Sequence, residues 1–187
     1  SPPHPTMTTP TPDSTAMQDG LHDLLWRVRL SALYHLKRER FLDGVDRASS
    51  AVAALGGAAA FASIQTNPDF GQSVAGLIAI ISAGALVYGP AAKARRHSEL
   101  ARDYRLLEAD VVEQTDWSAD KLASFNSRYR RLEASEPAAL GALVTQCHNE
   151  LAAAQGSREH ITPLRWYERL LKNWFDFDQS TTQASNL

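Results

Sequence analysis

Two long stretches without a charged side chain constrain this chain more than any other feature. Residues 48–68 read ASSAVAALGGAAAFASIQTNP and residues 70–92 read FGQSVAGLIAIISAGALVYGPAA, with Asp69 alone between them. A helix that crosses a bilayer needs roughly 20 mostly apolar residues, and both stretches are long enough. The sequence therefore allows two arrangements: a pair of membrane spans, or the buried helical hairpin of a soluble protein.

The side chains of the second stretch favour the membrane. A helix in a small soluble domain keeps a polar face, but from Val74 onward only Ser82 and Tyr88 carry hydrogen-bonding side chains. The first stretch is weaker, because it consists mostly of Ala, Gly and Ser, and it would insert as the partner of the second. We predict a transmembrane hairpin over residues 48–92.

Basic residues flank this hairpin on both sides in the sequence. They are Lys37, Arg38, Arg40 and Arg47 before it, and Lys93, Arg95 and Arg96 after it. The connection between the two spans, at about 48–66 and 72–92, carries no basic residue. Lys and Arg collect on the cytoplasmic side of membrane helices. The charges therefore predict two cytoplasmic termini and a short loop on the opposite side.

Small residues recur at intervals of four along both stretches. They are Ser49, Ala53, Gly56, Gly57 and Ala60 in the first stretch, and Ala75, Ala79 and Ala83 in the second, with Ser82 beside them. Small residues at this spacing let helix backbones approach closely inside lipid. We interpret these positions as packing surfaces of the spans or, after assembly of several copies, as the lining of a pore.

The remaining sequence predicts helices only. Apolar residues at helical spacing, such as Leu100, Tyr104, Leu107 and Val111, fill the part after the hairpin, and no alternating pattern predicts a strand. The expected segments are a disordered tail rich in Pro, Thr and Ser (1–20), a juxtamembrane cytoplasmic helix (21–47), a cytoplasmic helical region (93–178) and a loose tail (179–187). We predict an all-α protein, a two-helix transmembrane hairpin continuous with a cytoplasmic helical bundle.

Aromatic residues gather in the last predicted helix, which should begin near Pro163. Trp166, Tyr167 and Trp174 are mixed there with Arg and Lys residues. Such a helix can lie in the membrane interface, or its aromatic side chains can pack onto the cytoplasmic helices. The second interpretation is favoured, since three acidic residues dilute the positive charge; these are Glu168, Asp176 and Asp178.

The sequence predicts no catalytic residue, cofactor or metal site. It has no glycine-rich phosphate loop, none of its six histidines has a metal-binding spacing, and Cys147 is its one cysteine. His35 and Glu39 lie one helical turn apart, and we interpret them as part of a solvated face next to the membrane. The net charge of -2 gives no reason to expect a nucleic-acid partner. An enzyme is the class with the least support.

The arrangement of the chain resembles the SLATT domains, which are two-transmembrane effectors associated with SMODS and SLOG proteins. The resemblance covers roughly residues 21–177 and depends on Tyr34-His35 and Arg38/Arg40 before the hairpin, and on a second group after it; these are His97, Leu100 and Tyr104. It implies a bacterial inner-membrane effector of an anti-phage conflict system, which forms homo-oligomers and opens a pore when a sensor or nucleotide-signalling partner activates it. Two other classes stay open, a phage holin-like lysis protein and an anchor or scaffold protein without a pore.

Overall fold

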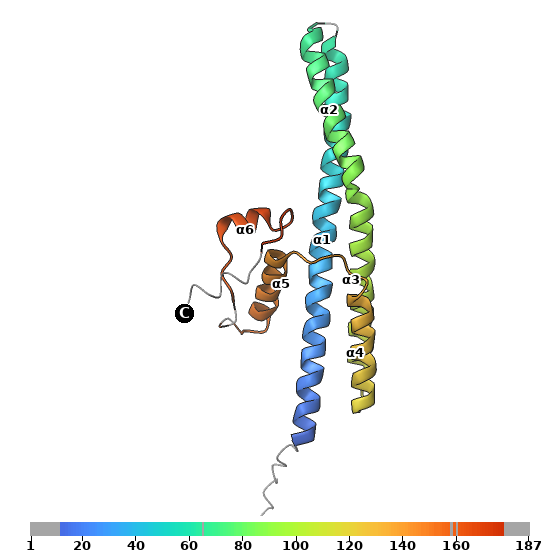
Figure 1. Ribbon diagram of the computed structural model, residues 1–187, viewed down its shortest axis with the longest axis vertical. Coiled ribbons are helices and arrows are strands. Elements are labelled where there is room, and N and C mark those ends of the chain that lie inside the picture. Colours follow the sequence, from blue (N-terminus) through green and yellow to red (C-terminus); the bar gives the residue numbers. More distant parts are fainter. Residues whose placement is uncertain (1–11, 65, 158, 160, 178–187) are drawn as a thin grey trace, which may run out of the picture.

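The computed structural model describes residues 12–64, 66–157, 159 and 161–177, and among these it contains helices and no strand. The helices are α1 (Pro12–Ile64), α2 (Pro68–Tyr88), α3 (Pro90–Glu113), α4 (Ala119–Glu133), α5 (Gly141–Ala154) and α6 (Trp166–Leu171). The predicted all-α class and the pair of long apolar helices are confirmed. Figure 1 shows a long α1 that pairs with α2 at one end and with α3 and α4 at the other.

Helix α1 is a single rod of 53 residues, which corresponds to about 80 Å. It passes without a break through Gly44, so the predicted juxtamembrane helix and the first predicted span belong to one helix. The prediction of a disordered tail is wrong for residues 12–20, because α1 begins at Pro12. These turns gain tertiary packing that composition does not reveal: a Cβ atom on Gly20 would lie only 2.9 Å from the Leu122 side chain of α4. The rest of that tail, and the tail predicted at 179–187, lie outside the described residues.

Local capping explains where α2 begins and ends. The Asn67 side chain accepts a hydrogen bond from the Phe70 backbone N–H at 3.2 Å, and Pro68 occupies the first turn. At the other end Gly89 adopts φ 62°, a left-handed conformation that glycine tolerates best, and Pro90 starts α3. The helix is therefore completely broken between α2 and α3, and the break is centred on Gly89.

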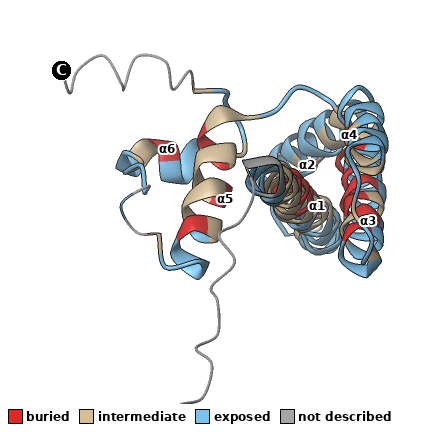
Figure 2. Ribbon diagram, turned by 90° about the horizontal axis from the view of Figure 1, so that it is seen from below, coloured by how far each residue is buried: buried red, intermediate tan, exposed pale blue. Residues whose placement is uncertain are grey.

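Below the hairpin, α1 lies between two groups of helices. Figure 2 views the molecule along its length, with α3 and α4 on one side of α1 and with α5 and α6 on the other. One buried cluster joins α1, α3 and α4 and contains Leu24, Val28, Ala32, Tyr104, Leu107, Val111 and Tyr129. A second cluster joins α1 to α5 and contains Tyr34, Leu143 and Cys147. The apolar spacing predicted for α3 is confirmed by this burial.

Three names describe the parts used below. The apolar hairpin is residues 48–64 of α1 together with α2. The packed bundle is residues 12–47 of α1 together with α3 and α4. The side lobe is residues 141–177, which contain α5 and α6. The break at Gly89, between α2 and α3, separates the hairpin from the packed bundle.

Candidate functional site: the apolar hairpin and the polar cluster at its base

The apolar hairpin has an outer surface of large apolar side chains. Leu86 and Val87 are 84% and 89% exposed, and Leu55, Phe61 and Ile80 also point outward. Both long helices are apolar enough to cross a membrane, and only 6% of the most apolar 18-residue stretch of each is buried. A core helix of a soluble protein would be mostly buried. Ile81, which a soluble fold would have to cover, is exposed as well.

Glycine makes the close contact between the two helices of the hairpin. A Cβ atom on Gly56 of α1 would lie 2.6 Å from the Ile78 side chain of α2. Near the tip, a Cβ atom on Gly71 would lie 3.1 Å and 3.2 Å from backbone atoms of Ile64 and Ala60. Ala60 is buried in this contact. Of the small residues that the sequence predicted as packing positions, Gly56 and Ala60 therefore do pack inside the hairpin.

The other predicted small residues lie elsewhere on the hairpin. Ala75, Ala79, Ser82 and Ala83 of α2 are exposed. Gly57 is also exposed, and a Cβ atom on it would meet nothing within 4 Å. Apart from Ser82, which borders the cleft at the base of the hairpin, these positions lie on an outward surface that the partner helix of the same chain does not cover.

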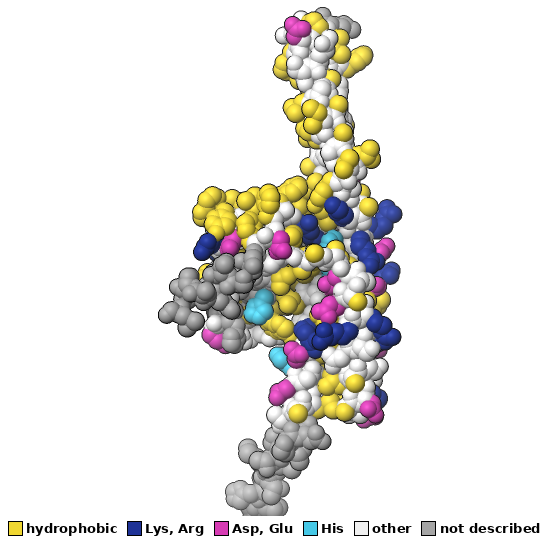
Figure 3. All heavy atoms as spheres, viewed as in Figure 1, with side chains coloured by type: hydrophobic (Ala, Val, Ile, Leu, Met, Phe, Trp, Pro, Cys, Tyr) yellow, Lys and Arg dark blue, Asp and Glu magenta, His cyan; other side chains and the backbone are white. Residues whose placement is uncertain are grey.

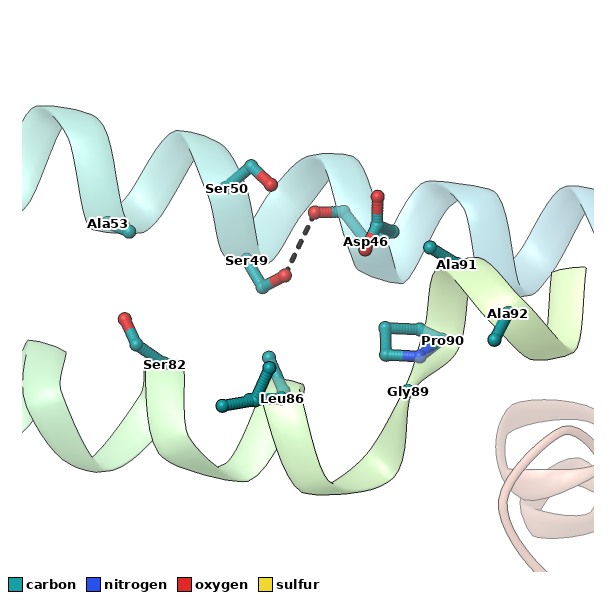
Figure 4. A pocket seen from close by; sticks show the side chains of 11 residues that line it. Asp46, Ser49, Ser50, Ala53, Ser82, Leu86, Gly89, Pro90, Ala91 and Ala92 are labelled. Carbon is teal, nitrogen blue, oxygen red and sulfur yellow. Dashed lines mark hydrogen bonds between the residues drawn. The ribbon is translucent and has the colours of Figure 1, made fainter.

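Ser49 and Ala53 line a cleft at the base of the hairpin, where α1 and α2 diverge. The cleft has a volume of about 390 Å³ and reaches from Asp46 to Ser82 and to the break at Gly89. Figure 4 shows the Ser49 and Ser82 side chains pointing toward the facing helices. The Ser49 hydroxyl donates to the Asp46 carbonyl at 2.9 Å, so its hydrogen bond is made within its own helix.

Some of the predicted flanking basic residues bind protein groups below the hairpin. Lys37 donates to Glu150 of α5 at 2.9 Å, and Arg38 donates to the backbone carbonyl of Asn173. Arg96 donates to the Ser135 carbonyl at 3.0 Å. The remaining ones lie on the outer surface: Arg40, Arg47, Lys93 and Arg95. Figure 3 shows Lys and Arg side chains gathered just below the hairpin.

A buried pair of histidines lies directly below the hairpin, between α1 and α3. The Nδ1 atoms of His35 and His97 are 2.8 Å apart, and neither ring is exposed by more than 6%. A hydrogen bond between two Nδ1 atoms needs one proton, since one nitrogen must donate and the other must accept. The pair therefore holds one shared proton, and a second proton at this position would remove the bond.

Two tyrosines and a glutamate complete this polar cluster, which we define as Tyr34, His35, His97, Tyr104 and Glu136. Tyr104 donates to Glu136, and Glu136 Oε1 also lies 3.1 Å from His35 Nε2, an ion-pair distance without hydrogen-bond alignment. The Tyr104 ring stacks on His35 at 5.8 Å. The Tyr34 hydroxyl accepts from the Leu140 backbone N–H at 3.1 Å. The cluster thus joins α1, α3 and the connection from α4 to α5.

Burial is the main influence on proton binding in the cluster. It lowers the pKa of His97 to about 4, with a further contribution from His35 and Arg38, so His97 is neutral near pH 7. Burial also raises the pKa of Tyr104, and the hydrogen bond to Glu136 adds to that effect. The pKa of Tyr34 is raised chiefly by burial. The tyrosines therefore stay protonated and act as fixed hydrogen-bonding groups.

The interpretation of His35 as a solvated residue is wrong. His35 continues the buried side of α1 that contains Val28 and Ala32, and its ring lies against His97 of α3. Spacing contained this signal, because positions 28, 32 and 35 follow one helix face. The same rule places His97 on the face of Leu100. What spacing alone did not give is that the two faces meet.

The predicted aromatic interface residues lie in the side lobe beside the base of the hairpin. Trp166 is 75% exposed, and Trp174 is exposed as well. The Trp174 ring lies 5.2 Å from the ring of Phe41. Tyr167 is partly covered, and its hydroxyl accepts from Arg165 at 2.7 Å. Helix α6 begins at Trp166 instead of near Pro163, because Arg165 is extended and its N–H is capped by Glu168.

The described residues contain no group of three or more His, Cys, Asp and Glu side chains placed to hold a metal ion. In the polar cluster this follows from geometry, since His97 and Glu136 approach opposite nitrogens of His35. Burial raises the pKa of the Cys147 thiol to about 12, which makes it a poor nucleophile. No protein-family model matches the chain, and comparisons with curated proteins and with solved structures find no match.

Proposed function

We propose that this chain is a two-span protein of the bacterial inner membrane that forms homo-oligomers and permeabilises the membrane. The observation that carries the proposal is the outer surface of the apolar hairpin, where large side chains such as Leu86 and Val87 have no protein cover. Removing apolar area from water contributes roughly 25 cal/mol per Å². A bilayer supplies this gain along both helices at once, and the two helices have the length that a bilayer needs.

The basic residues support an orientation with both termini in the cytoplasm. Arg40, Arg47, Lys93 and Arg95 all lie at the end of the hairpin that continues into the packed bundle. The opposite end contains Asn67, Pro68 and Asp69 and no basic residue. This asymmetry is the one that orients membrane proteins with their positive loops inside. The packed bundle and the side lobe are then cytoplasmic.

The outward small residues of α2 support assembly of several copies. Ala75, Ala79 and Ala83 are exposed along one side of α2, where a second hairpin can approach closely. The spans contain hydroxyl groups but no charged residue away from the tip. A coupled carrier or proton relay normally needs such a residue. An opening lined by Ser and Ala side chains would therefore discriminate weakly among solutes.

The polar cluster supports a resting state that is held closed from the cytoplasm. It ties α1 to α3 just below the break at Gly89, so a change in their packing reaches both spans. The resemblance to SLATT effectors supplies the biological setting, a conflict system in which a separate sensor or nucleotide-signalling protein activates the pore. The activating contact would lie on the packed bundle or the side lobe.

Expression of variants in bacteria, with a dye that reports membrane potential, tests the proposal. We expect the activated wild-type protein to collapse the potential and to release dye from vesicles. Ala79→Lys should abolish both effects while the protein is still synthesised. Ala109→Lys, at an exposed position of α3, is the matched control and should retain them. If the wild-type protein fractionates with membranes yet leaves the potential and the vesicles intact, the chain is an anchor or scaffold and not a pore.

A further inference from the structure

We infer that the end of the side lobe, residues 163–177, lies on the headgroup region of the cytoplasmic leaflet and forms a second membrane contact beside the hairpin. This inference depends on the proposed insertion of the hairpin, and it names the lipid surface as the partner of the lobe. We call these residues the lobe edge. Three observations support the membrane contact of the lobe edge: its exposed apolar side chains, its position at the base of the hairpin, and the exposure of its basic side chains.

The lobe edge exposes several large apolar side chains, although it belongs to the part of the molecule that lies outside the apolar hairpin. Trp166 and Leu170 are 75% and 69% exposed, and Leu171, Trp174 and Phe175 are exposed beside them. Large contiguous apolar patches on soluble surfaces usually mark a binding site for protein or membrane. Trp in particular is enriched where membrane and water meet, because it joins a large ring to one N–H donor.

Contacts place this patch at the level where the apolar hairpin ends. The Trp174 ring lies 6.3 Å from the ring of Tyr88, the last residue of α2, and 5.2 Å from Phe41 of α1. Arg38 holds the segment from below by donating to the Asn173 carbonyl. In Figure 3 apolar side chains cover the edge of the lobe that faces the hairpin end of the molecule, with basic side chains beside and below them. The patch thus continues the apolar surface of the hairpin.

The two described acidic residues of the lobe edge oppose a membrane less than their number suggests, because Glu168 is buried and Asp176 is engaged by a backbone N–H. Glu168 is buried and accepts from the Arg165 backbone N–H at 2.7 Å. Asp176 accepts from the Gly141 backbone N–H at 2.9 Å. Arg165 and Arg169 remain exposed. Glu168 is therefore withdrawn from the surface and does not dilute the positive charge there, whereas Asp176 stays exposed. Asp178 lies outside the described residues.

These observations favour lipid over a second protein chain as the occupant. A membrane that receives the hairpin necessarily brings its headgroup layer to the level of Tyr88, where Trp174 already lies. Exposed Arg side chains next to aromatic rings match anionic headgroups above an apolar layer. A second chain would need an apolar face of complementary shape at the same level. Lipid offers apolar contact there without any such complementarity.

Site-directed spin labelling tests the lobe edge. Leu170→Cys carries the label in the lobe, Leu77→Cys in the hairpin, and Leu106→Cys on the outer face of α3. The buried Cys147 thiol, with its raised pKa, escapes the same labelling. The protein is reconstituted as one copy per nanodisc of phosphatidylethanolamine and phosphatidylglycerol, and collisions with oxygen and with a water-soluble nickel chelate are measured. We expect the chelate to reach positions 170 and 77 several-fold less than position 106.

The outcomes separate the two proposals. Protection at 77 with full chelate access at 170 overturns the lobe contact and leaves the hairpin in the membrane. Full access at 77 overturns the membrane insertion on which both depend. If 170 becomes protected only when discs contain several copies, its partner is a second chain, and the lipid contact is wrong. Protection at 170 in single-copy discs supports it.

Discussion

The upper and lower parts of α1 show how the same kind of side chain serves two different surroundings. In the packed bundle Leu24, Val28 and Leu42 are fully buried, because α3, α4 and α5 surround that part of the helix. In the hairpin Leu55 and Phe61 of the same helix are exposed, because α2 covers only one side. The hydrophobic effect acts on both parts, so the cover that the hairpin lacks within the chain must come from outside it.

Polar groups differ between the two parts in the same way. The packed bundle buries His35 and His97 and gives each a partner on another helix. In the hairpin, hydroxyls such as those of Ser63 and Ser73 bind their own helix. Ser63 donates to the Ala59 carbonyl at 2.8 Å, and Ser73 donates to the Asp69 carbonyl at 2.9 Å. Backbone and side-chain groups that are satisfied within one helix tolerate lipid. In the bundle, buried polar side chains bind groups on other helices. In the hairpin, these polar side chains make their hydrogen bonds within their own helix.

The same substitution in the hairpin and in the packed bundle is the strongest test of the difference between them. Leu77 of α2 is 59% exposed and Leu106 of α3 is 56% exposed. Leu77→Lys should lose membrane integration, because a Lys in the centre of a span costs about 2.5–3.5 kcal/mol. Leu106→Lys should be nearly neutral, since Asp103 and Asp110 lie three and four residues away on the same helix. Carbonate extraction of membranes measures the difference, and equal behaviour of the two variants would mean that the hairpin does not meet lipid.

Acid should weaken the packed bundle specifically. The folded pKa of His97 is about 4, against an ordinary value of 6.5, so the unfolded chain takes up a proton first as the pH falls. Stability from this group is complete above pH 6.5, declines between 6.5 and about 4, and is constant below that. The full loss corresponds to roughly 3 kcal/mol. Denaturant unfolding in detergent, followed at a series of pH values, measures it.

A variant without the imidazole isolates this contribution. His97→Phe should be less stable at neutral pH, because the His35 Nδ1 atom loses its buried partner, at a cost of about 1–3 kcal/mol. Its stability should then depend much less on pH between 6.5 and 4. The groups that face His97 are His35 and Arg38 from α1, Arg96 from α3 and Glu136 from the connection between α4 and α5. An unchanged pH dependence would assign the effect to one of these.

The break at Gly89 should be sensitive to any side chain. Gly89 has φ 62°, and an L-residue pays about 1–2 kcal/mol for the left-handed conformation. Gly89→Ala should therefore favour a continuous helix from α2 into α3 and change the angle at which the hairpin leaves the bundle. Gly44→Ala, within α1 and facing open space, should instead stabilise the helix by about 0.5–1 kcal/mol. Spin-label distances between α2 and α4 report the angle, and a Gly89→Ala protein with unchanged distances would show that the break is not held by glycine.

Sequence alone supplied the parts of the fold that depend on local periodicity. The all-helical class and the buried face of α3 with Leu100 and Tyr104 were both predicted from the spacing of apolar residues. The helical start at Pro12 was not, because packing of Gly20 against α4 supports it. Propensity misses such contacts between distant segments, which is why composition indicated a tail there.

The candidate sites divide along the same line. The apolar surface of the hairpin was visible in the sequence, since each residue contributes to it independently. The polar cluster was not visible, because His35, His97 and Glu136 come from segments far apart in the chain. Only the packing of α1, α3 and the connection from α4 to α5 brings them together. A histidine on an apolar helix face is a weak sign of a buried partner, and nothing in the spacing names that partner.

The smallest expected effect distinguishes the two neighbouring glycines of the hairpin. A Cβ atom on Gly56 would meet Ile78 at 2.6 Å, whereas a Cβ atom on Gly57 meets nothing. Because the Ile78 atom involved is the end of a flexible side chain, Gly56→Ala should loosen the hairpin by less than about 1 kcal/mol, and Gly57→Ala should tighten the helix by a similar amount through propensity. Steric trapping or thermal unfolding in micelles can resolve this difference in sign. If Gly57→Ala is instead the disruptive variant in lipid but not in micelles, Gly57 packs against a second hairpin, and the outward surface of the spans is an assembly surface as proposed.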